Sequence, residues 1–416
     1  MEIKQHLVVH PSKAIIGTKS KLLKGKTVVL CICGSVAAVK SPEIARELMR
    51  NGADVHAVMS REAMRIIHPH LMEWATGNPV VTRLTGKVEH IALCEGADLV
   101  IVAPATANTI SKIAHGICDT AVTIIVSTAL GRKIPVIIAP AMHESLYKNP
   151  FVSENVEKLK KSGIVVVEPE IEGGRAKIAS TSRIVGAIIN LFTPRSLEGR
   201  KVLITAGPTR EHMDDVKFLS TPSSGKMGIA LAEECAAAGA DVTLVLGPTF
   251  ISPPQGVRVV NVISCEEMMR AVLSLLEERY DIIFLSAAPP DFTFSERQRG
   301  KISSDLEELN VRLVKSPRII SEVRKHAPDS IIVGFKAEFG VSAEELVERA
   351  YRRLLENDLD FIVANDVSRT DIGFCSDFNE VYIVDRRRNV LHIPRSSKRE
   401  VAREIIRAVL GERHGS

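Results

Sequence analysis

The first half of the sequence carries three polar turns and a histidine that together could bind an anion and move a proton. The turn at residues 34–36 (Gly-Ser-Val) follows an apolar run, and its glycine, hydroxyl and N–H groups could receive phosphate. Similar turns lie at residues 104–109 and 140–147. His90 lies between the first two turns, and an imidazole with an ordinary pKa of ~6.5 can take and return a proton near neutrality. Taken singly, the first turn could equally be a tight strand-to-helix connection, and His90 a structural histidine on a helix.

The second half carries another set of candidate phosphate-binding turns. Residues 204–211 (Ile-Thr-Ala-Gly-Pro-Thr-Arg-Glu) follow a strand-like run, and residues 223–228 (Ser-Ser-Gly-Lys-Met-Gly) open a helical pattern. A glycine-bearing turn at a helix N-terminus attracts phosphate. Lys226 is followed by Met, so the turn does not fit the P-loop pattern, and an ordinary serine-capped helix would explain it as well. Asp291 ends a later strand-like run, where it could also be a helix-capping carboxylate, and Lys301 follows ten residues after it.

Short apolar runs alternate with helical stretches along the chain, which predicts parallel sheets covered by helices on both faces. Ligands of such sheets bind beyond the carboxyl ends of the strands, where these polar turns lie. The predicted fold class is therefore α/β, with two doubly wound, Rossmann-like domains. The predicted strands are 27–33, 54–59, 98–103, 135–139, 164–167, 201–206, 242–246, 281–286, 331–335 and 361–364, with an edge strand at 381–385.

A polar segment at residues 193–200, which contains Pro and Gly, separates the two sets of strands. We therefore place the domain boundary so that the predicted domains are residues 1–195 and 196–416. A chain of 416 residues with 45% apolar residues is long enough to bury a core in each.

The composition argues against several classes of partner. Fifty-four Lys and Arg residues balance 50 Asp and Glu residues, so the formal charge of +4 does not indicate nucleic acid as a partner. The seven cysteines show no C-x-x-C spacing, which argues against zinc sites and disulfides and favours a cytoplasmic location. No apolar run reaches the ~18 residues of a membrane span, so neither membrane insertion nor secretion is expected.

With His90 in the stretch ahead of Ala97-Asp98, the three turns of the first half resemble the flavin-containing cysteine decarboxylase family, from about Lys26 to Val185. The resemblance implies a flavodoxin-like domain in which the turns hold FMN and substrate and His90 is catalytic. The implied reaction is the oxidative decarboxylation of 4'-phosphopantothenoylcysteine, in which FMN oxidises the cysteinyl thiol to a thioaldehyde that can lose CO2. The residues implied to bind FMN are Gly34, Ser35, Val36, Ser60, Thr106 and Asn108.

Two departures from that family affect the substrate contacts. The family's P-x-M-N-x-x-M motif here has His143 in place of Asn and Leu146 in place of the second Met. Relatives also carry a proton-donating cysteine shortly before a Gly-Arg pair, and matching that pair to Gly174-Arg175 puts Glu168 near the place of the cysteine. The implied substrate contacts are His143 and Arg175, and Lys177 is a candidate proton donor or phosphate clamp.

Five ordered motifs of the second half look like phosphopantothenate-cysteine ligase, from about Leu197 to Ile393. They are T-A-G-P-T-R-E, S-S-G-K-M-G, S-A-A-P-P-D, G-F-K-A-E and A-N-D-V. The resemblance implies activation of a carboxylate by CTP and Mg²⁺ to an acyl cytidylate, which cysteine then attacks. Lys301 would stabilise negative charge, Asp291 would hold the nucleotide or Mg²⁺, and Thr221 replaces an asparagine that meets the acyl intermediate. The implied nucleotide-binding residues are Gly207, Ser224, Gly225, Lys226, Ser286, Ala287, Asp291, Lys301, Phe335, Lys336, Ala337, Glu338 and Asn365.

The order of the two resemblances is that of a bifunctional enzyme of coenzyme A biosynthesis. Flavin relatives form trimers and ligase relatives form dimers, so the resemblances imply a homo-oligomer, in combination a dodecamer. Two alternatives stay open: an active ligase with an idle or differently specific flavin half, and a non-catalytic regulatory subunit that keeps the flavin fold. The choice between CTP and ATP is also open.

Overall fold

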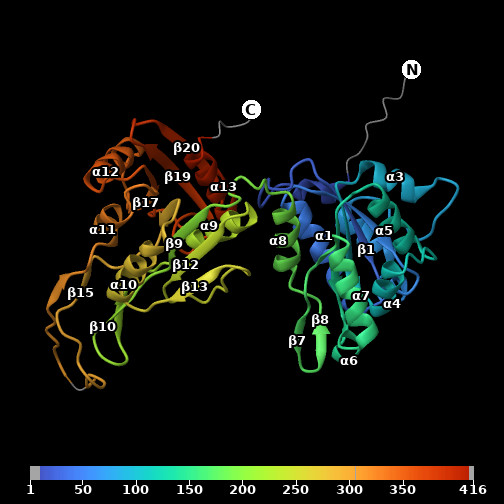
Figure 1. Ribbon diagram of the computed structural model, residues 1–416, viewed down its shortest axis with the longest axis horizontal. Coiled ribbons are helices and arrows are strands. Elements are labelled where there is room, and N and C mark those ends of the chain that lie inside the picture. Colours follow the sequence, from blue (N-terminus) through green and yellow to red (C-terminus); the bar gives the residue numbers. More distant parts are fainter. Residues whose placement is uncertain (1–9, 305, 412–416) are drawn as a thin grey trace. The chain divides into compact units, whose positions relative to one another are not determined.

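The computed structural model describes residues 10–304 and 306–411. The chain divides after Phe192 into two compact units, each of which has its own sheet and its own buried core (Figure 1). Both units are α/β, as predicted.

The first unit is built on a five-stranded parallel sheet in the order β2-β1-β3-β4-β6. This is the flavodoxin-like order, in which the chain changes direction across the sheet between β1 and β3. Its strands are β1 (Thr27–Ile32), β2 (Asp54–Met59), β3 (Leu99–Ala105), β4 (Val136–Pro140) and β6 (Val165–Val166). Strand β3 is buried along its whole length, as expected of a strand covered on both faces.

Helices cover both faces of this sheet because each presents an apolar stripe to it. On α1, for example, Ile44, Leu48 and Met49 are buried at helical spacing. One face packs against α1 (Ser41–Arg50), α2 (Pro69–Thr76) and α8 (Thr181–Leu191), and the other against α3 (Glu89–Gly96), α4 (Ala107–Ala114), α5 (Ala121–Gly131) and α7 (Pro150–Lys161). Shorter helices are η1 (Pro11–Ile15), η2 (Val36–Lys40), η3 (Ala63–Arg65) and α6 (Glu144–Tyr147).

A small antiparallel sheet in the order β5-β8-β7 was not predicted. Its strands are only two or three residues long, too short to produce a recognisable alternation in sequence. They are β5 (Met142–His143), β7 (Glu170–Glu172) and β8 (Arg175–Lys177).

The second unit contains an eight-stranded sheet in the order β13-β12-β9-β14-β17-β18-β19-β20, parallel from β13 to β18. Residues 381–385 form a strand as predicted, but the prediction that this strand is an edge was wrong. It belongs to β19, which pairs on both sides, and the edge is β20. The strands are β9 (Lys201–Ala206), β12 (Asp241–Leu246), β13 (Arg258–Asn261), β14 (Ile282–Leu285), β17 (Ile331–Glu338), β18 (Phe361–Asp366), β19 (Phe378–Asp385) and β20 (Val390–Ser397).

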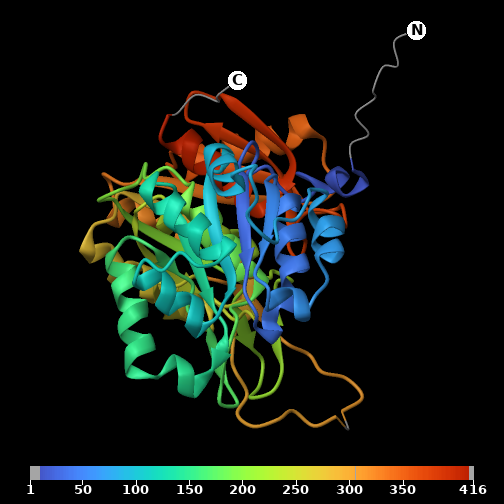
Figure 2. The same ribbon diagram turned by 90° about the vertical axis from the view of Figure 1, so that its right-hand side faces the viewer.

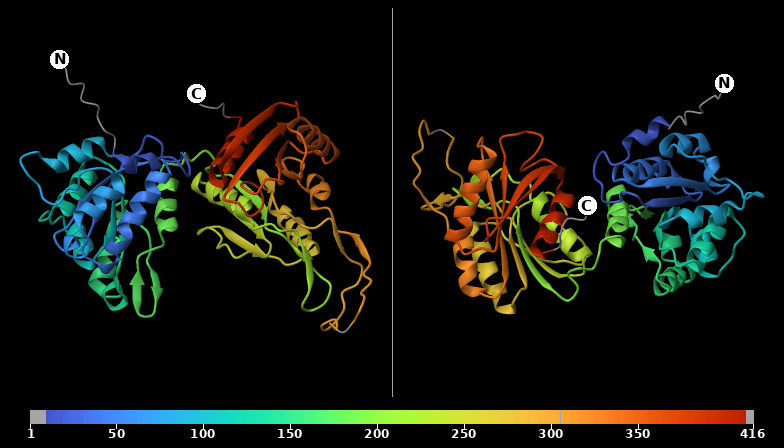
Figure 3. Two further views of the ribbon diagram at one scale, coloured as in Figure 1. Left: turned by 180° about the vertical axis from the view of Figure 1, so that it is seen from behind. Right: turned by 90° about the horizontal axis from the view of Figure 1, so that it is seen from above.

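Helices again cover both faces of the sheet (Figure 3). One face packs against α9 (Lys226–Ala237) and α13 (Lys398–Val409), and the other against α10 (Cys265–Leu275), η4 (Leu276–Glu278), α11 (Ile319–His326) and α12 (Ala343–Glu356).

Two hairpin-like additions extend from the second unit. The first is the pair β10 (Arg210–His212) and β11 (Phe218–Ser220), and the second joins β15 (Phe292–Phe294) to β16 (Leu313–Lys315) through a long connection. We call residues 292–304 and 306–315 the arm; it projects from the unit in Figures 1 and 2.

Candidate functional site

The fold brings together the three predicted turns of the first unit. Strands β1, β3 and β4 are neighbours in the sheet, so the turns that follow them meet at one edge. The N–H of Cys33 donates to the carbonyl of Pro104 at 3.2 Å, and the N–H of Ala141 donates to the carbonyl of Ala105 at 2.9 Å. These bonds tie the second turn to both of the others.

The first turn has a structural reason for its glycine. A Cβ atom on Gly34 would lie 2.3 Å from the Cβ of Glu62, so only glycine lets the chain after β2 pass this close. The Ser35 hydroxyl accepts from the N–H of Ala37 at 3.4 Å and caps η2, and the Val36 side chain is exposed. Packing therefore accounts for Gly34, while Ser35 and Val36 stay at the surface of the edge.

The other predicted FMN contacts border the same edge. Thr106 caps α4 by accepting from the N–H of Thr109 at 3.3 Å, and Asn108 is exposed in the first turn of that helix. The Ser60 hydroxyl accepts from the N–H of Ala63 at 3.1 Å. Burial raises the pKa of the neighbouring Cys33 thiol to about 11, against opposing hydrogen bonds from Thr109 and Thr106, so this cysteine is neutral and inert.

His90 lies on a different element from the turns. It is the second residue of α3, which packs on α5, and its Nδ1 atom is buried with no hydrogen-bond partner among the described residues. The preceding Val88 has φ 52°, a left-handed conformation that a β-branched residue seldom adopts. A buried ring nitrogen without a partner and a strained residue beside it are both common at functional sites.

The predicted substrate contacts share the small antiparallel sheet. His143 on β5 is opposite Arg175 on β8, and Arg175 is opposite Glu172 on β7. Side chains directly opposite each other lie on the same face, and Lys177, two residues after Arg175, lies there too. Lys177 forms an ion pair with Glu172 at 2.7 Å and is exposed. This face therefore collects an imidazole, a guanidinium and an ammonium group.

Glu168, near the place of the relatives' cysteine, is an ion-paired carboxylate. It accepts a hydrogen bond from the Tyr147 hydroxyl and forms an ion pair with Lys160 at 2.7 Å. Burial opposes ionisation, but Lys160 and Tyr147 hold the pKa of Glu168 below its ordinary value. In this arrangement Glu168 therefore favours the ionised carboxylate and is poorly suited to donate a proton in place of the cysteine.

These features are compatible with a bound FMN. The carboxyl edge offers hydroxyl groups, exposed turns and helix N-termini to a phosphate, and His90 supplies a buried polar atom that needs a partner.

The second unit contains a cavity of about 360 Å³ lined by residues of all five ligase-like motifs. Predicted residues that line the cavity are Thr221, Gly225, Lys226, Ser286, Ala287, Asp291, Phe335, Lys336, Ala337 and Asn365; Gly207, Ser224, Lys301 and Glu338 are absent from its lining. The carboxyl ends of β9, β14, β17 and β18 lie side by side at this place, which explains why motifs far apart in sequence meet.

Two glycines let α9 approach the strand ends. Gly225 precedes the helix with φ 77°, and a Cβ atom there would lie 3.3 Å from the Cα of Gly207. A Cβ atom on Gly228 would lie 2.4 Å from the Cβ of Ala206 and 2.7 Å from the Ser286 Oγ. Gly207 therefore packs against Gly225 at the start of α9 and does not line the cavity.

The helix is not capped by serine, so that interpretation of the S-S-G-K-M-G motif was wrong. The N-cap is Gly225, and no side chain caps the helix. The Ser224 hydroxyl instead donates to the carbonyl of Phe374 at 2.6 Å, and the Lys226 ammonium donates to the carbonyl of Cys375 at 2.9 Å. Both side chains are thereby directed at the loop between β18 and β19.

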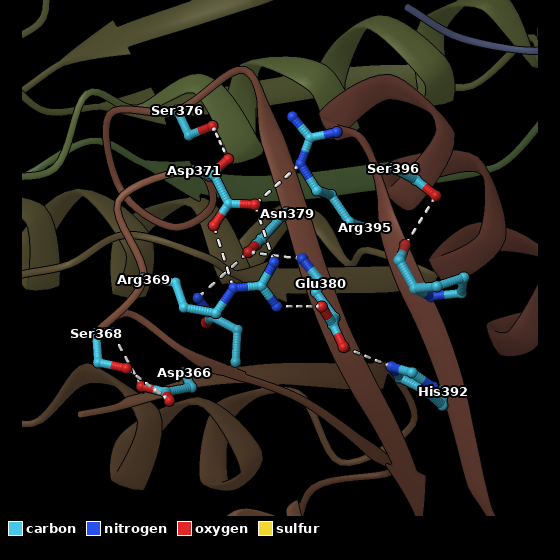
Figure 4. Close-up of polar contacts among 12 residues, drawn as sticks. Asp366, Ser368, Arg369, Asp371, Ser376, Asn379, Glu380, His392, Arg395 and Ser396 are labelled. Atoms are coloured by element: carbon cyan, nitrogen blue, oxygen red, sulfur yellow. Dashed lines mark hydrogen bonds and ion pairs between the residues drawn. The ribbon is translucent and has the colours of Figure 1, made fainter. Parts of the chain in front are cut away.

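The loop between β18 and β19 is also held by a network of ion pairs and hydrogen bonds (Figure 4). Arg369 contacts Asp371 and Glu380, Glu380 accepts from His392 at 2.9 Å, and Arg395 forms an ion pair with Asp371 at 3.1 Å. The network fixes the loop that presents Gly373 and Phe374 to the cavity.

The predicted base-binding strand end is only partly exposed to the cavity. Phe335, Lys336 and Ala337 line it, whereas Glu338 pairs with Lys336 at 2.9 Å and with Arg349 at 2.7 Å. Burial opposes ionisation, but these two cations hold the pKa of Glu338 below its ordinary value. Glu338 therefore orients Lys336.

Asp291 and Lys301, both predicted to bind the nucleotide, are separated by part of the arm. Asp291 lines the cavity and is exposed, whereas Lys301 lies on the arm outside the lining. The backbone beside Lys301 is fixed on both sides: the N–H of Gly300 donates to Asp215 at 2.8 Å, and the N–H of Ile302 donates to the fully buried Asp214 at 2.9 Å.

Sequence reasoning missed several residues that line the cavity. Arg353 reaches it from α12, Asn379 from β19 and Lys398 from the start of α13, and residues 316–320 form a further wall. A signal for Lys398 was present: Ser397 and Glu400 form a capping box, which marks a helix N-terminus at this point.

The described residues contain neither a clustered metal site nor a membrane-spanning helix. Residues 10–304 and 306–411 contain no group of three His, Cys, Asp or Glu side chains that could hold a metal ion. No helix in the same ranges combines the length and the apolar composition needed to cross a membrane. Magnesium commonly uses one or two carboxylates together with substrate phosphates, so Asp291 alone is chemically suited to it.

Comparison with known proteins gives the family. A family model described as Flavoprotein matches residues 16–193, and one described as DNA/pantothenate metabolism flavoprotein C-terminal domain matches residues 197–412. The chain is 47% identical over 404 residues to the Coenzyme A biosynthesis bifunctional protein CoaBC of Thermococcus kodakarensis, which covers 96% of this chain and 98% of that protein.

Solved structures match each half. The crystal structure of the C-terminal domain of a Coenzyme A biosynthesis bifunctional protein CoaBC is 32% identical, covers 52% of this chain and 96% of its own, and has a TM-score of 0.44. The FMN-dependent cysteine decarboxylase SpaF is 31% identical, covers 40% of this chain and 97% of its own, and has a TM-score of 0.36. From the family models and the full-length relative, the chain belongs to the family of bifunctional coenzyme A biosynthesis proteins, with a flavoprotein decarboxylase half followed by a ligase half.

Proposed function

We propose that the chain joins cysteine to 4'-phosphopantothenate with CTP and Mg²⁺, and then decarboxylates the product with FMN to give 4'-phosphopantetheine. The observation that carries this proposal is the cavity of about 360 Å³ in the second unit, which gathers residues from five sequence motifs at four neighbouring strand ends.

In the ligase half, the cavity residues bring two anions together. Gly225 and Lys226 at the start of α9 bind phosphate groups, and Phe335 and Ala337 frame the nucleotide base. Mg²⁺, when bound, neutralises the phosphates. Asp291 holds that ion, and Thr221, which also lines the cavity, meets the activated carboxylate through its hydroxyl.

Lys301 is the proposed group for stabilising charge on the reacting phosphate. Its position outside the cavity lining means that this role requires the arm to approach the cavity.

In the decarboxylase half, the turns at the carboxyl edge hold the cofactor through Ser35, Thr106 and the helix N-termini beside them. FMN supplies the two-electron chemistry at the cysteinyl carbon. His90 exchanges a proton with the substrate, since its Nδ1 atom has no competing partner among the described residues. Arg175 and His143, on one face of the small sheet, hold the substrate's anionic groups.

We propose that the active form is a homo-oligomer in the cytoplasm. Trimers of the first unit combined with dimers of the second would give a dodecamer, which light scattering on the purified protein would detect.

A coupled assay tests the proposed function. The purified protein, supplied with phosphopantothenate, cysteine, CTP and Mg²⁺, is expected to release pyrophosphate and CO2 together and to show the absorption of bound flavin. Release of pyrophosphate without CO2 would refute the decarboxylase half, and release of neither would refute the proposal. Replacing CTP with ATP in the same assay measures the nucleotide preference.

A further inference from the structure

Lys398 is a buried lysine in the wall of the ligase cavity. Its relative exposure is 6%, it is the first residue of α13, and it lines the cavity together with Lys226. Its ammonium donates to the carbonyl of Gly373 at 2.7 Å and to that of Phe374 at 3.1 Å. An ammonium group has three N–H donors, so these two bonds leave one donor for a ligand.

The surroundings of Lys398 are unfavourable for a cation. The N-terminus of a helix carries partial positive charge, and Lys398 is at the N-terminus of α13. On the neighbouring α9, Lys226 adds a second positive charge; on the loop, Asp377 supplies a carboxylate that already pairs with Lys226 at 2.7 Å, and Cys375 supplies a thiol. Glu400, on α13 itself, is engaged by Ser397. The site therefore has an excess of positive charge that a bound anion would balance.

We propose that Lys398 binds a phosphate group of a ligase substrate, together with Lys226 and the N–H groups at the start of α9. The inference rests on the proposed ligase function, whose two larger substrates, the nucleotide and 4'-phosphopantothenate, both carry phosphate. The phosphate supplies the counter-charge that the protein does not, and the charge-assisted hydrogen bond uses the remaining N–H donor of Lys398.

The titration of Lys398 distinguishes its proposed role in binding phosphate from its role in holding the loop that contains Gly373 and Phe374. Burial, followed by repulsion from Lys226, lowers the pKa of Lys398 to about 8, against the opposing attraction of Asp377 and Cys375. A neutral amine still has two N–H donors, which are enough for the two loop carbonyls. Above pH 8 the loop therefore stays held while the charge for phosphate is lost.

Titration calorimetry on the full chain tests the proposal. The probes are CTP with Mg²⁺, 4'-phosphopantothenate, and pantothenate, which lacks the phosphate, each at pH 7 and pH 9. The variants are Lys398→Met, which removes the charge, and Lys398→Arg, which keeps it at both pH values. Lys325→Met is the matched control, because Lys325 is an exposed lysine on α11 outside the cavity lining.

We expect Lys398→Met to weaken binding of CTP or of 4'-phosphopantothenate by about ten- to hundredfold at pH 7, whichever phosphate Lys398 contacts. The wild type should lose affinity for that ligand between pH 7 and pH 9, while Lys398→Arg should lose much less. Pantothenate binding and the control variant should be unaffected.

Two results would overturn the inference while leaving the ligase assignment intact: wild-type affinities in Lys398→Met for both phosphate ligands, or equal pH dependence in the wild type and Lys398→Arg. Absence of CTP and phosphopantothenate binding by the wild type would overturn both. If Lys398→Met fails to fold, comparing the ligand affinities of the wild type and Lys398→Arg at pH 7 and pH 9 still tests the proposal.

Discussion

At the scale of single residues, the proposed site residues of the two units differ in their surroundings. His90 has a buried ring nitrogen without a partner among the described residues, whereas Lys398 has partners but too much positive charge around it. Both conditions cost stability in the free protein and are relieved by a ligand, which is how polar groups at binding sites commonly differ from those of a core.

Replacing His90 by Asn should lower CO2 release by about 10²- to 10⁴-fold, because the group proposed to exchange the proton is lost. Pyrophosphate release should be unchanged, since the ligase cavity lies in the other unit. His115→Asn is the control, because the Nδ1 atom of His115 contacts the carbonyl of Ser111 at 2.9 Å and the side chain is exposed. Undiminished CO2 release from the His90 variant would remove this histidine from the mechanism.

The lowered pKa of Lys398 predicts a pH dependence of stability in the absence of substrates. The unfolded chain holds the proton up to about pH 10.5 and the folded chain only up to about pH 8, so the unfolded state binds more protons between these values. The free energy of unfolding should therefore rise with pH across this window, by up to about 3 kcal/mol more in the wild type than in Lys398→Met. Denaturant titrations of both proteins at pH 7, 8, 9 and 10 would measure the difference, and parallel curves would contradict it.

At the scale of elements, long buried strands were predictable and short polar ones were not. Strands such as β9 and β12 are apolar, are bounded by glycine turns and were predicted within a residue. The small sheet of β5, β7 and β8 has too few residues for periodicity and owes its position to contacts between segments distant in sequence.

The same contrast between predictable and unpredictable features applies to the cavity of the second unit. Turns that follow strands could be assigned to the cavity from the sequence, because strand ends define where ligands bind. Lys398 and Arg353 reach it from helices, and Lys301 is carried by an arm whose direction depends on hydrogen bonds to a different hairpin. No local pattern in the sequence specifies how near Lys398, Arg353 or Lys301 lies to the cavity.

The hydrogen bonds from Asp215 predict that the arm is anchored to the β10–β11 hairpin. Asp215→Asn weakens the bond to the N–H of Gly300 and the ion pair with Arg297, so trypsin should cut faster after Arg299 and Lys301. Asp385→Asn is the control, because Asp385 accepts from backbone N–H groups in a separate exposed turn. Mass spectrometry of the early fragments would identify the sites, and equal rates in both variants would contradict the anchoring.

If the anchored hairpin and the arm move together when Lys301 approaches the cavity, loss of the anchor should act on ligation through that lysine. Asp215→Asn should then slow pyrophosphate release in the wild-type background but add little to the loss in Lys301→Ala, since the two residues act as a unit. Full additivity of the two losses would mean that Asp215 acts elsewhere.

At the scale of the whole molecule, the connection between the units is short. Phe192 belongs to the first unit, where the Lys26 ammonium lies 4.9 Å from its ring centroid, and Leu197 is fully buried in the core of the second. The Thr193 hydroxyl accepts from Arg403 at 2.8 Å, so the second unit begins at Thr193, three residues before the start predicted from the sequence at residue 196.

Separate expression of residues 1–192 and 193–416 should therefore give two folded proteins, because each cut leaves a complete core. The second fragment is expected to release pyrophosphate from CTP without CO2, and the first to bind FMN and turn yellow. A fragment that starts at residue 196 should be less stable than one that starts at residue 193 by about 1 kcal/mol, because it lacks the hydrogen bond between Arg403 and Thr193. Denaturant titrations of the two fragments would measure this difference. An unfolded second fragment would show that the ligase unit depends on the flavoprotein unit for its stability, and the two activities would then have to be studied only in the intact chain.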